Sequence, residues 1–215
     1  MREALEASRA TLGSRHPQTI ATINNLGRLL QAQGKLEGAG ALLREALEAA
    51  RVTFGDQHPQ TLTSINNLGL LLETQGKLQD AEPLLREALE GRRATLSDQH
   101  QHTSESIFNL GELLLDQGKL DEAEPLLREA LEGLCATHGD RHPGTLNCMN
   151  MLRALQLQRA ALVGKQVLVH GLVAKPELNN RTGTAAGWDS ERGRYSVRLQ
   201  DGSLLSLKPA NLRKL

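Results

Sequence analysis

Apolar side chains recur every three or four residues over most of the chain, which is the spacing of one face of an α-helix. In residues 59–75 the recurring positions are Leu62, Ile65, Leu68 and Leu72. Pro59 suits a first helical position because its φ is already fixed near the helical value. Gly76 can take the left-handed conformation that follows a helix. The pattern predicts an amphipathic helix that begins at Pro59 and ends before Gly76.

A second amphipathic helix is predicted directly after Gly76. Its apolar side carries Leu78, Ala81, Leu85, Ala88 and Leu89. Charged residues such as Asp80 and Arg86 occupy the other side. Pro83 falls early in this helix, where the lost backbone donor costs least. The two helices together form one unit with two apolar faces to bury.

This unit is repeated along the chain. QGKLDEAEPLLREALE at 117–132 returns as QGKLQDAEPLLREALE at 75–90 and as QGKLEGAGALLREALE at 33–48. His-Pro pairs begin at residues 16, 58 and 142, and His100-Gln101 fills the remaining place, so the step is 42 residues. The spacing predicts three full units from about residue 17 and a terminal helix at about 143–160. The first residues align with the interior of a second helix, so we expect an incomplete first unit and a fragment of a longer array.

Small residues recur where the helices are expected to touch, as at Gly69, Ala81 and Ala88. A side chain of one carbon or none lets two backbones approach closely, while the leucines fill the space beside them. One helix pair cannot bury its apolar faces alone, but stacked pairs share a continuous core. A right-handed superhelix with a concave inner surface is the expected product.

The Leu-Gly and Ala-x-x-x-x-x-x-Ala pattern resembles the tetratricopeptide repeat, whose usual unit is about 34 residues. The longer step, the His-Pro-x-Thr start and Asn-Asn-Leu-Gly are similar to the variety found in kinesin light chains. The resemblance covers roughly residues 1–160, and the predicted array of helix pairs spans residues 1–162. It implies a mainly α fold, an α-solenoid of helix pairs.

The resemblance also implies a binding groove lined by the first helix of each unit. The fifth and ninth motif positions would face it, which selects Asn24, Arg28, Asn66, Phe108, Glu112 and Asn150. An asparagine ladder could hold an extended peptide by its backbone, because each amide offers donors and acceptors. The alternative is that these asparagines bond locally and brace neighbouring turns.

Residues 164–215 follow a different pattern. Tyr195, Val197 and Leu199 alternate with polar residues, as in a half-buried strand. Asp201-Gly202 between two strand-like runs indicates a hairpin. Four or five short strands predict a small all-β SH3-like barrel, similar to Tudor-like and KOW-like barrels.

Charge differs between the two predicted domains. Lys plus Arg equals Asp plus Glu over the whole chain, but residues 164–215 hold 9 basic and 4 acidic side chains. The excess could serve nucleic acid, or the basic barrel could dock on the acidic repeats of its own chain. Stacking platforms for bases are nearly absent, and Trp188 with Tyr195 is too few for a methyl-lysine cage.

No catalytic, cofactor or metal site is predicted. Cys135, His138, His142 and Cys148 are close in sequence, but each falls in a repeat position used for packing or turns. The four histidines of the repeat starts are predicted to brace the turn or cap the helix. Phosphate loops and nucleophile elbows do not occur, so the sequence does not indicate an enzyme.

The sequence therefore predicts a non-enzymatic scaffold or adaptor that binds a protein or an extended peptide. Two alternatives remain: a nucleic-acid or chromatin-associated module, and a regulatory part of a larger enzyme. Two cysteines, no signal peptide and no membrane-length apolar run predict a cytoplasmic protein without membrane contact.

Overall fold

The computed structural model describes residues 2–96, 100–189 and 192–215. The chain divides into two units, Met1–Met149 and Asn150–Leu215, and each is described by itself. This division falls inside the last helix, earlier than the domain boundary predicted between residues 162 and 164. That predicted boundary stays a prediction.

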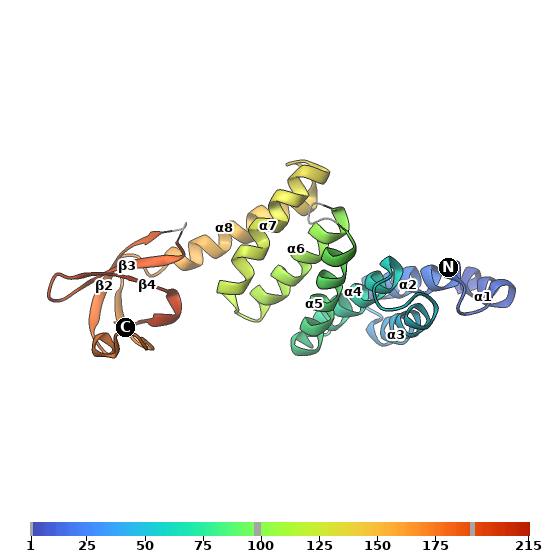
Figure 1. Cartoon of the computed structure of the whole chain (residues 1–215), viewed down its shortest axis with the longest axis horizontal. Coiled ribbons are helices and arrows are strands. Elements are labelled where there is room, and N and C mark those ends of the chain that lie inside the picture. The colour runs from blue at the N-terminus through green and yellow to red at the C-terminus, as the bar shows by residue number, and fades with distance from the viewer. Residues whose placement is uncertain (1, 97–99, 190–191) are drawn as a thin grey trace. The chain divides into compact units, whose positions relative to one another are not determined.

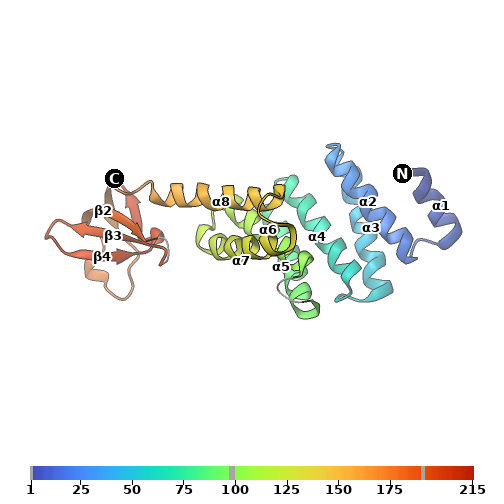
Figure 2. The ribbon, with the colours of Figure 1, turned by 90° about the horizontal axis from the view of Figure 1, so that it is seen from above.

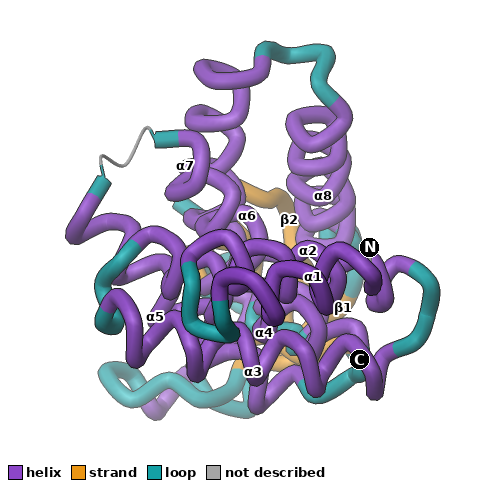
Figure 3. The backbone as a smooth tube through the Cα atoms, turned by 90° about the vertical axis from the view of Figure 1, so that its right-hand side faces the viewer, coloured by secondary structure: helices purple, strands orange, loops and turns teal. Residues whose placement is uncertain are grey.

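In the described residues, the regular elements of the first unit are all helices, and the last of them continues into the second unit (Figures 1 and 3). Their bounds are α1 (Arg2–Leu12), α2 (Pro17–Ala32), α3 (Leu36–Phe54), α4 (Pro59–Thr74), α5 (Leu78–Thr95), α6 (Gln101–Asp116), α7 (Leu120–His138) and α8 (Pro143–Ala160). The α2–α3 pair and α4 follow one another in space as they do in sequence (Figure 2). The predicted mainly α architecture of paired helices is confirmed.

The first helix of each unit is capped by its histidine. The Nδ1 atoms of His16 and His58 accept hydrogen bonds of 3.2 Å from the backbone N–H groups of Gln18 and Gln60. His100 and His142 repeat this contact at the same distance. An acceptor at this place satisfies one of the free N–H groups of the first turn. The predicted capping role of these histidines is confirmed.

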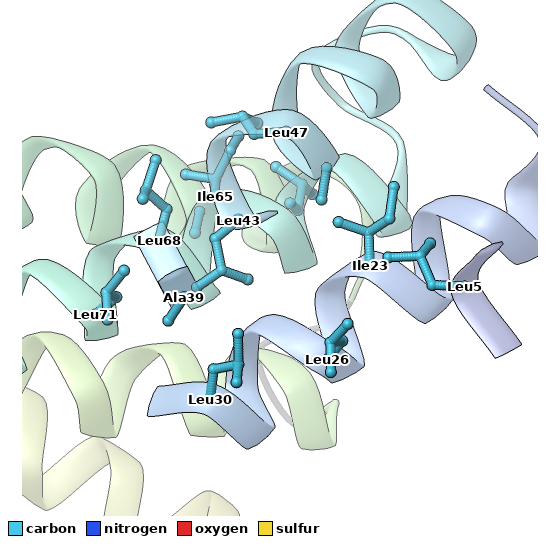
Figure 4. Packing of buried hydrophobic residues seen from close by; sticks show 13 residues of the cluster. Leu5, Ile23, Leu26, Leu30, Ala39, Leu43, Leu47, Ile65, Leu68 and Leu71 are labelled. Carbon is cyan, nitrogen blue, oxygen red and sulfur yellow. The ribbon is translucent and has the colours of Figure 1, made fainter. Parts of the chain in front are cut away.

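Within each pair, the two helices pack through glycine–leucine contacts. These contacts repeat along the array. A Cβ built on Gly69 of α4 would lie 2.7 Å from Leu85 Cδ2 of α5, so only glycine permits this approach. The same contact joins Gly27 to Leu43 and Gly111 to Leu127. In Figure 4, Ala39 and Leu43 of α3 lie among the buried leucines of α2 and α4. Each repeated phrase therefore has the same packing role in its own unit.

The second unit contains a five-stranded antiparallel sheet in the order β4-β3-β2-β1-β5. The strands are β1 (Gln166–Val169), β2 (Thr182–Asp189), β3 (Arg194–Leu199), β4 (Leu204–Leu207) and β5 (Leu212–Lys214). Short 3-10 helices precede β2 (Pro176–Leu178) and β5 (Pro209–Asn211). Val167, Val197 and Tyr195 belong to its buried core. A small all-β region after the helices is confirmed, while closure into an SH3-like barrel stays a prediction.

The turn between β3 and β4 has the predicted hairpin chemistry. The Asp201 carboxylate accepts a hydrogen bond of 2.9 Å from the backbone N–H of Ser203, and Gly202 has a φ of 84°. Glycine takes this left-handed conformation without a steric penalty. Val197 then pairs with Leu205 across the two strands.

Candidate functional site

A hollow of about 130 Å³ lies between the first helices of two successive units, α2 and α4. Six of its eight lining residues have polar side chains, and the lining consists of Ile20, Ala21, Asn24, Asn25, Arg28, Gln60, Thr63 and Asn67. Amide, hydroxyl and guanidinium groups converge there, and together they offer both donors and acceptors. We refer to this set of residues as the amide hollow.

Two of the three asparagines predicted at the fifth position, Asn24 and Asn66, brace neighbouring first helices. Asn24 Nδ2 donates a 2.8 Å hydrogen bond to Ser64 Oγ of α4, and Asn67 Nδ2 donates one of 3.4 Å to Asn24 Oδ1. One unit further on, Asn109 Nδ2 donates to Asn66 Oδ1 at 3.1 Å. Both asparagines are buried. The structure therefore gives them local bracing bonds, and their contact with a ligand stays a prediction.

The other predicted groove residues are spread over three helices. Arg28 is exposed and lines the amide hollow together with Asn24. Phe108 and Glu112 are half-buried and lie about one turn apart on α6. Asn150 is exposed and belongs to the second unit. Of the predicted residues, only Asn24 and Arg28 belong to the amide hollow.

Sequence reasoning missed several residues of the amide hollow. Gln60, in the first turn of α4, has a buried Oε1 atom without a hydrogen-bond partner in the described part of the chain. Asn25 is exposed beside it in the lining. The second asparagine of the Asn-Asn-Leu-Gly motif was the available signal, because Asn67 and Asn109 both occupy that place. The prediction used only the fifth and ninth positions of the motif and therefore omitted this second asparagine.

Three carboxylates lie on the next junction of first helices, between α4 and α6. Burial, and then the charges of Glu112 and Asp116, raise the pKa of Glu73 to about 7. Burial, and then Asp116, raise the pKa of Glu112 as well. The Glu73 Oε1 atom is buried and has no hydrogen-bond partner among the described residues. We call Glu73, Glu112 and Asp116 the acidic cluster. Its carboxyl groups contrast with the positively charged guanidinium of Arg28 at the first junction.

Comparison with protein families settles the class of the helical array. The model described as "Tetratricopeptide repeat" matches residues 1–51, 19–94, 70–136 and 102–161, which together span most of the chain. The chain belongs to the tetratricopeptide repeat family. A comparison with curated proteins finds no match.

Several solved structures share the tetratricopeptide architecture. Nearly identical TPR-like repeats assigned to a kinesin light chain of Podosopora anserina are 25% identical, with a TM-score of 0.60, and cover 73% of this chain and 74% of that chain. BtubC (BKLC) from P. vanneervenii is 19% identical, with a TM-score of 0.59 and coverage of 73% and 70%. The Yersinia enterocolitica chaperone SycD, solved with a peptide of the translocator YopD, is 19% identical, with a TM-score of 0.51 and coverage of 67% and 97%. The kinesin light chain-like form of the repeat expected from the sequence is therefore supported by structure.

The cysteine and histidine residues near the end of the tetratricopeptide array have packing and capping roles. Cys148 is buried, and its Sγ donates a 3.2 Å hydrogen bond to the Leu127 carbonyl. Burial, and then the nearby Cys135, raise the pKa of Cys148 to about 11. His138 lies beside the capping His142, with ring centroids 4.5 Å apart. Among the described residues, no group of three or more His, Cys, Asp and Glu side chains is placed to hold a metal ion.

The aromatic pair of the second unit is part of its core. Tyr195 is only 1% exposed, and its ring centroid lies 4.8 Å from that of Trp188. A ring buried to this degree is not available to stack on a base or to enclose a methylated lysine.

In the described part of the chain, none of the helices is both long enough and apolar enough to span a membrane.

Proposed function

We propose that the tetratricopeptide array binds an extended peptide segment of a partner protein along the face formed by α2, α4 and α6. The observation that carries this proposal is the amide hollow between α2 and α4. An extended peptide has unpaired backbone N–H and C=O groups, and a lining of amides can pair with both. Repeat arrays of this kind present such extended surfaces to their partners.

We assign two roles to the side chains of this face: some would support the wall of the amide hollow, and others would contact the peptide. Asn24 is held by Ser64 of α4, so we assign it to shaping the wall of the amide hollow, and Asn66, held by Asn109 of α6, would support the next junction. Arg28 and Asn25 are exposed, and Gln60 has an unpaired buried acceptor, so these three are assigned to direct contact. Phe108 and Glu112 would extend the surface along α6, while a binding role for Asn150 stays a prediction from the sequence.

Charge gives the bound peptide a direction. Arg28 stands at the α2 side of this face, and the acidic cluster of Glu73, Glu112 and Asp116 stands at the α4–α6 side. A ligand with an acidic residue over Arg28 and a basic residue over the cluster would match both charges. Such complementarity fixes the register of a peptide more than it raises its affinity.

The test begins with a phage-displayed library of random peptides selected on the full chain. A selected peptide is then titrated against the wild type and against a double variant, Asn25→Ala with Arg28→Ala. Both positions are exposed, so the helical content should not change. We expect a loss of affinity of at least about tenfold in the double variant.

Arg44→Ala is the matched control, because Arg44 is exposed on α3 and outside the amide hollow. It should bind the selected peptide like the wild type. Equal binding by the wild type and the double variant would contradict the proposed groove. An equal loss in the control would show general charge attraction, which also contradicts it.

A further inference from the structure

The second unit carries more positive charge than its own carboxylates neutralise. Residues 164–215 hold 9 basic and 4 acidic side chains. Asp201 pairs with Arg181 at 2.5 Å, and Asp189 lies 3.8 Å from the guanidinium of Arg192. The remaining cationic side chains form no ion pair within the described residues, and they are Lys165, Lys175, Arg194, Arg198, Lys208, Arg213 and Lys214.

One of these cations, Arg198, belongs to a row of side chains that crosses four strands of the sheet. Arg198 of β3 is paired with Leu204 of β4 and with Thr184 of β2. Thr184 is paired in turn with Gln166 of β1. Side chains alternate between the two faces of a strand, and the neighbouring Val197 is buried in the core. The row therefore lies on the outer face of the sheet.

A second row lies beside the first, two residues away along each strand, and contains another of these cations. Thr182 of β2 is paired with Leu168 of β1, and Leu168 is paired with Arg213 of β5. At the other end of the row, Gln200 Nε2 donates a 3.0 Å hydrogen bond to Thr182 Oγ1. Neither row contains a carboxylate. We call the two rows together the basic face.

The two arginines of the basic face stand on either side of a polar strip. Arg198 and Arg213 are three strand spacings apart, which corresponds to about 14 Å. Between them, Gln166 Nε2 donates a 3.0 Å hydrogen bond to Thr184 Oγ1, which holds both side chains close to the sheet. Both arginines are exposed. Their guanidinium groups can therefore bind two phosphates that lie on opposite sides of the strip.

We propose that the basic face binds double-stranded RNA through its phosphates and 2′-hydroxyl groups. A single strand fits poorly because unstacked bases need aromatic platforms, and the aromatic rings of residues 164–215, Trp188 and Tyr195, pack together at the core. B-DNA is read by a helix or a ribbon that enters its major groove. The wide, shallow minor groove of an RNA duplex instead suits a surface of several strands, whose hydroxyl and amide groups can pair with 2′-hydroxyls. This function is independent of the peptide groove, since all its residues belong to the second unit.

The test is a titration of the full chain against a fluorescein-labelled RNA duplex, followed by fluorescence anisotropy at several salt concentrations. The double variant Arg198→Ala with Arg213→Ala should weaken binding at least about tenfold at low salt. Because two phosphate contacts are lost, the slope of log affinity against log salt should become shallower by about 2. Trp188 is the one tryptophan of the chain and packs against the core of the sheet, so its emission reports whether the variant stays folded.

A charge-matched control separates the basic face from general attraction. Lys165→Ala with Lys175→Ala removes the same charge from two exposed positions outside both rows, and it should leave the salt slope as in the wild type. A DNA duplex of the same sequence should bind at least about tenfold more weakly than the RNA. Absence of RNA binding at low salt, or equal losses in the two double variants, would overturn the proposal. Equal affinity for the DNA duplex, or for a peptide of ten glutamates, would also overturn it, since the face would then recognise negative charge of any kind.

Discussion

The junction of α2 with α4 and the junction of α4 with α6 use equivalent positions for different chemistry. In the first, Gln31 Nε2 donates to Thr74 Oγ1 at 2.8 Å and to the Leu70 carbonyl at 3.3 Å. In the second, the place of Gln31 is taken by Glu73. It faces Glu112 and Asp116, which stand at the positions of Leu70 and Thr74. At these positions the first junction is joined by hydrogen bonds, and the second brings three carboxylates together.

The contacts inside each helix pair do not vary in this way. A Cβ added to Gly27 would lie 2.7 Å from Leu43 Cδ2, and one added to Gly69 would lie at the same distance from Leu85 Cδ2. The repeat therefore keeps the packing that makes a pair and changes the side chains on the face between first helices. A surface that varies while its scaffold stays constant can acquire a ligand preference without losing the fold.

The largest expected effect distinguishes the two leucines at one repeat position. Leu71→Ala removes a fully buried side chain and should lower the free energy of unfolding by about 2–5 kcal/mol. Leu29→Ala, at the 40% exposed place, should cost less than about 1 kcal/mol. Urea denaturation followed by circular dichroism at the helical band measures both. Equal losses of stability in the two variants would show that Leu29 is covered as well as Leu71.

A smaller effect is expected from closing the gap inside a helix pair. Gly69→Ala places a methyl group against Leu85 and should cost about 1–3 kcal/mol. Gly38→Ala is the matched control in α3, where a Cβ would meet only Leu30 at an ordinary 3.5 Å. There the gain in helix propensity should stabilise the chain by up to about 1 kcal/mol. A stabilising Gly69→Ala would contradict the packing role given to the glycine.

Much of the fold could be predicted because the repeat compares the chain with itself. Pro59 and Gly76 bound α4 as expected, and the step of 42 residues transfers these limits to the other units. Alternation along 195–199 correctly placed β3. These signals are local, since backbone preference and the spacing of apolar residues act within a few positions.

The candidate site was less predictable because it depends on contacts between units. Burial of Asn24 follows from Ser64 and Asn67, which are 40 and 43 residues away. The motif position alone does not show which amide forms a hydrogen bond with a neighbouring helix and which amide stays exposed. The raised pKa of Glu73 likewise needs the facing helix. Comparing Gln31 with Glu73 at the same repeat position was the sequence signal that could have revealed it.

Glu73 should make the stability of the array depend on pH. Its pKa is raised from 4.5 to about 7 in the folded state, so the folded chain holds a proton that the unfolded chain has released. Stability should therefore fall as pH rises from about 4.5 to about 7 and then level off. Because Glu73 is only partly buried, water screens its interactions. We therefore expect the free energy of unfolding to fall by about 1 kcal/mol in total.

Glu73→Gln should remove the share of this dependence that Glu73 contributes and make the second junction resemble the first, while Glu112, whose pKa is also raised, keeps its own share. Urea denaturation at pH values below, within and above the titration range measures the difference between the variant and the wild type. Glu48→Gln is the control, because Glu48 is exposed on α3 and away from the acidic cluster. If both variants followed the wild-type pH curve, the like-charge cluster would have no role in stability.

The smallest expected effect concerns the second helices, where the junctions agree with each other. Arg9 pairs with Glu45 at 2.5 Å, Arg51 with Glu87 at 2.7 Å, and Arg93 with Glu129 at 2.5 Å. A double-mutant cycle of Arg51→Ala and Glu87→Ala should give a coupling of about 0.2–1 kcal/mol, because both side chains are partly exposed and their charges are screened by water. Added salt should reduce it. The cycle is needed because Arg51 also lies 3.2 Å from Asp56, so the single variant removes two pairs. A coupling of several kcal/mol that salt does not change would mean that the ion pairs, and not apolar packing such as that of α3 on Leu71 of α4, hold successive units together.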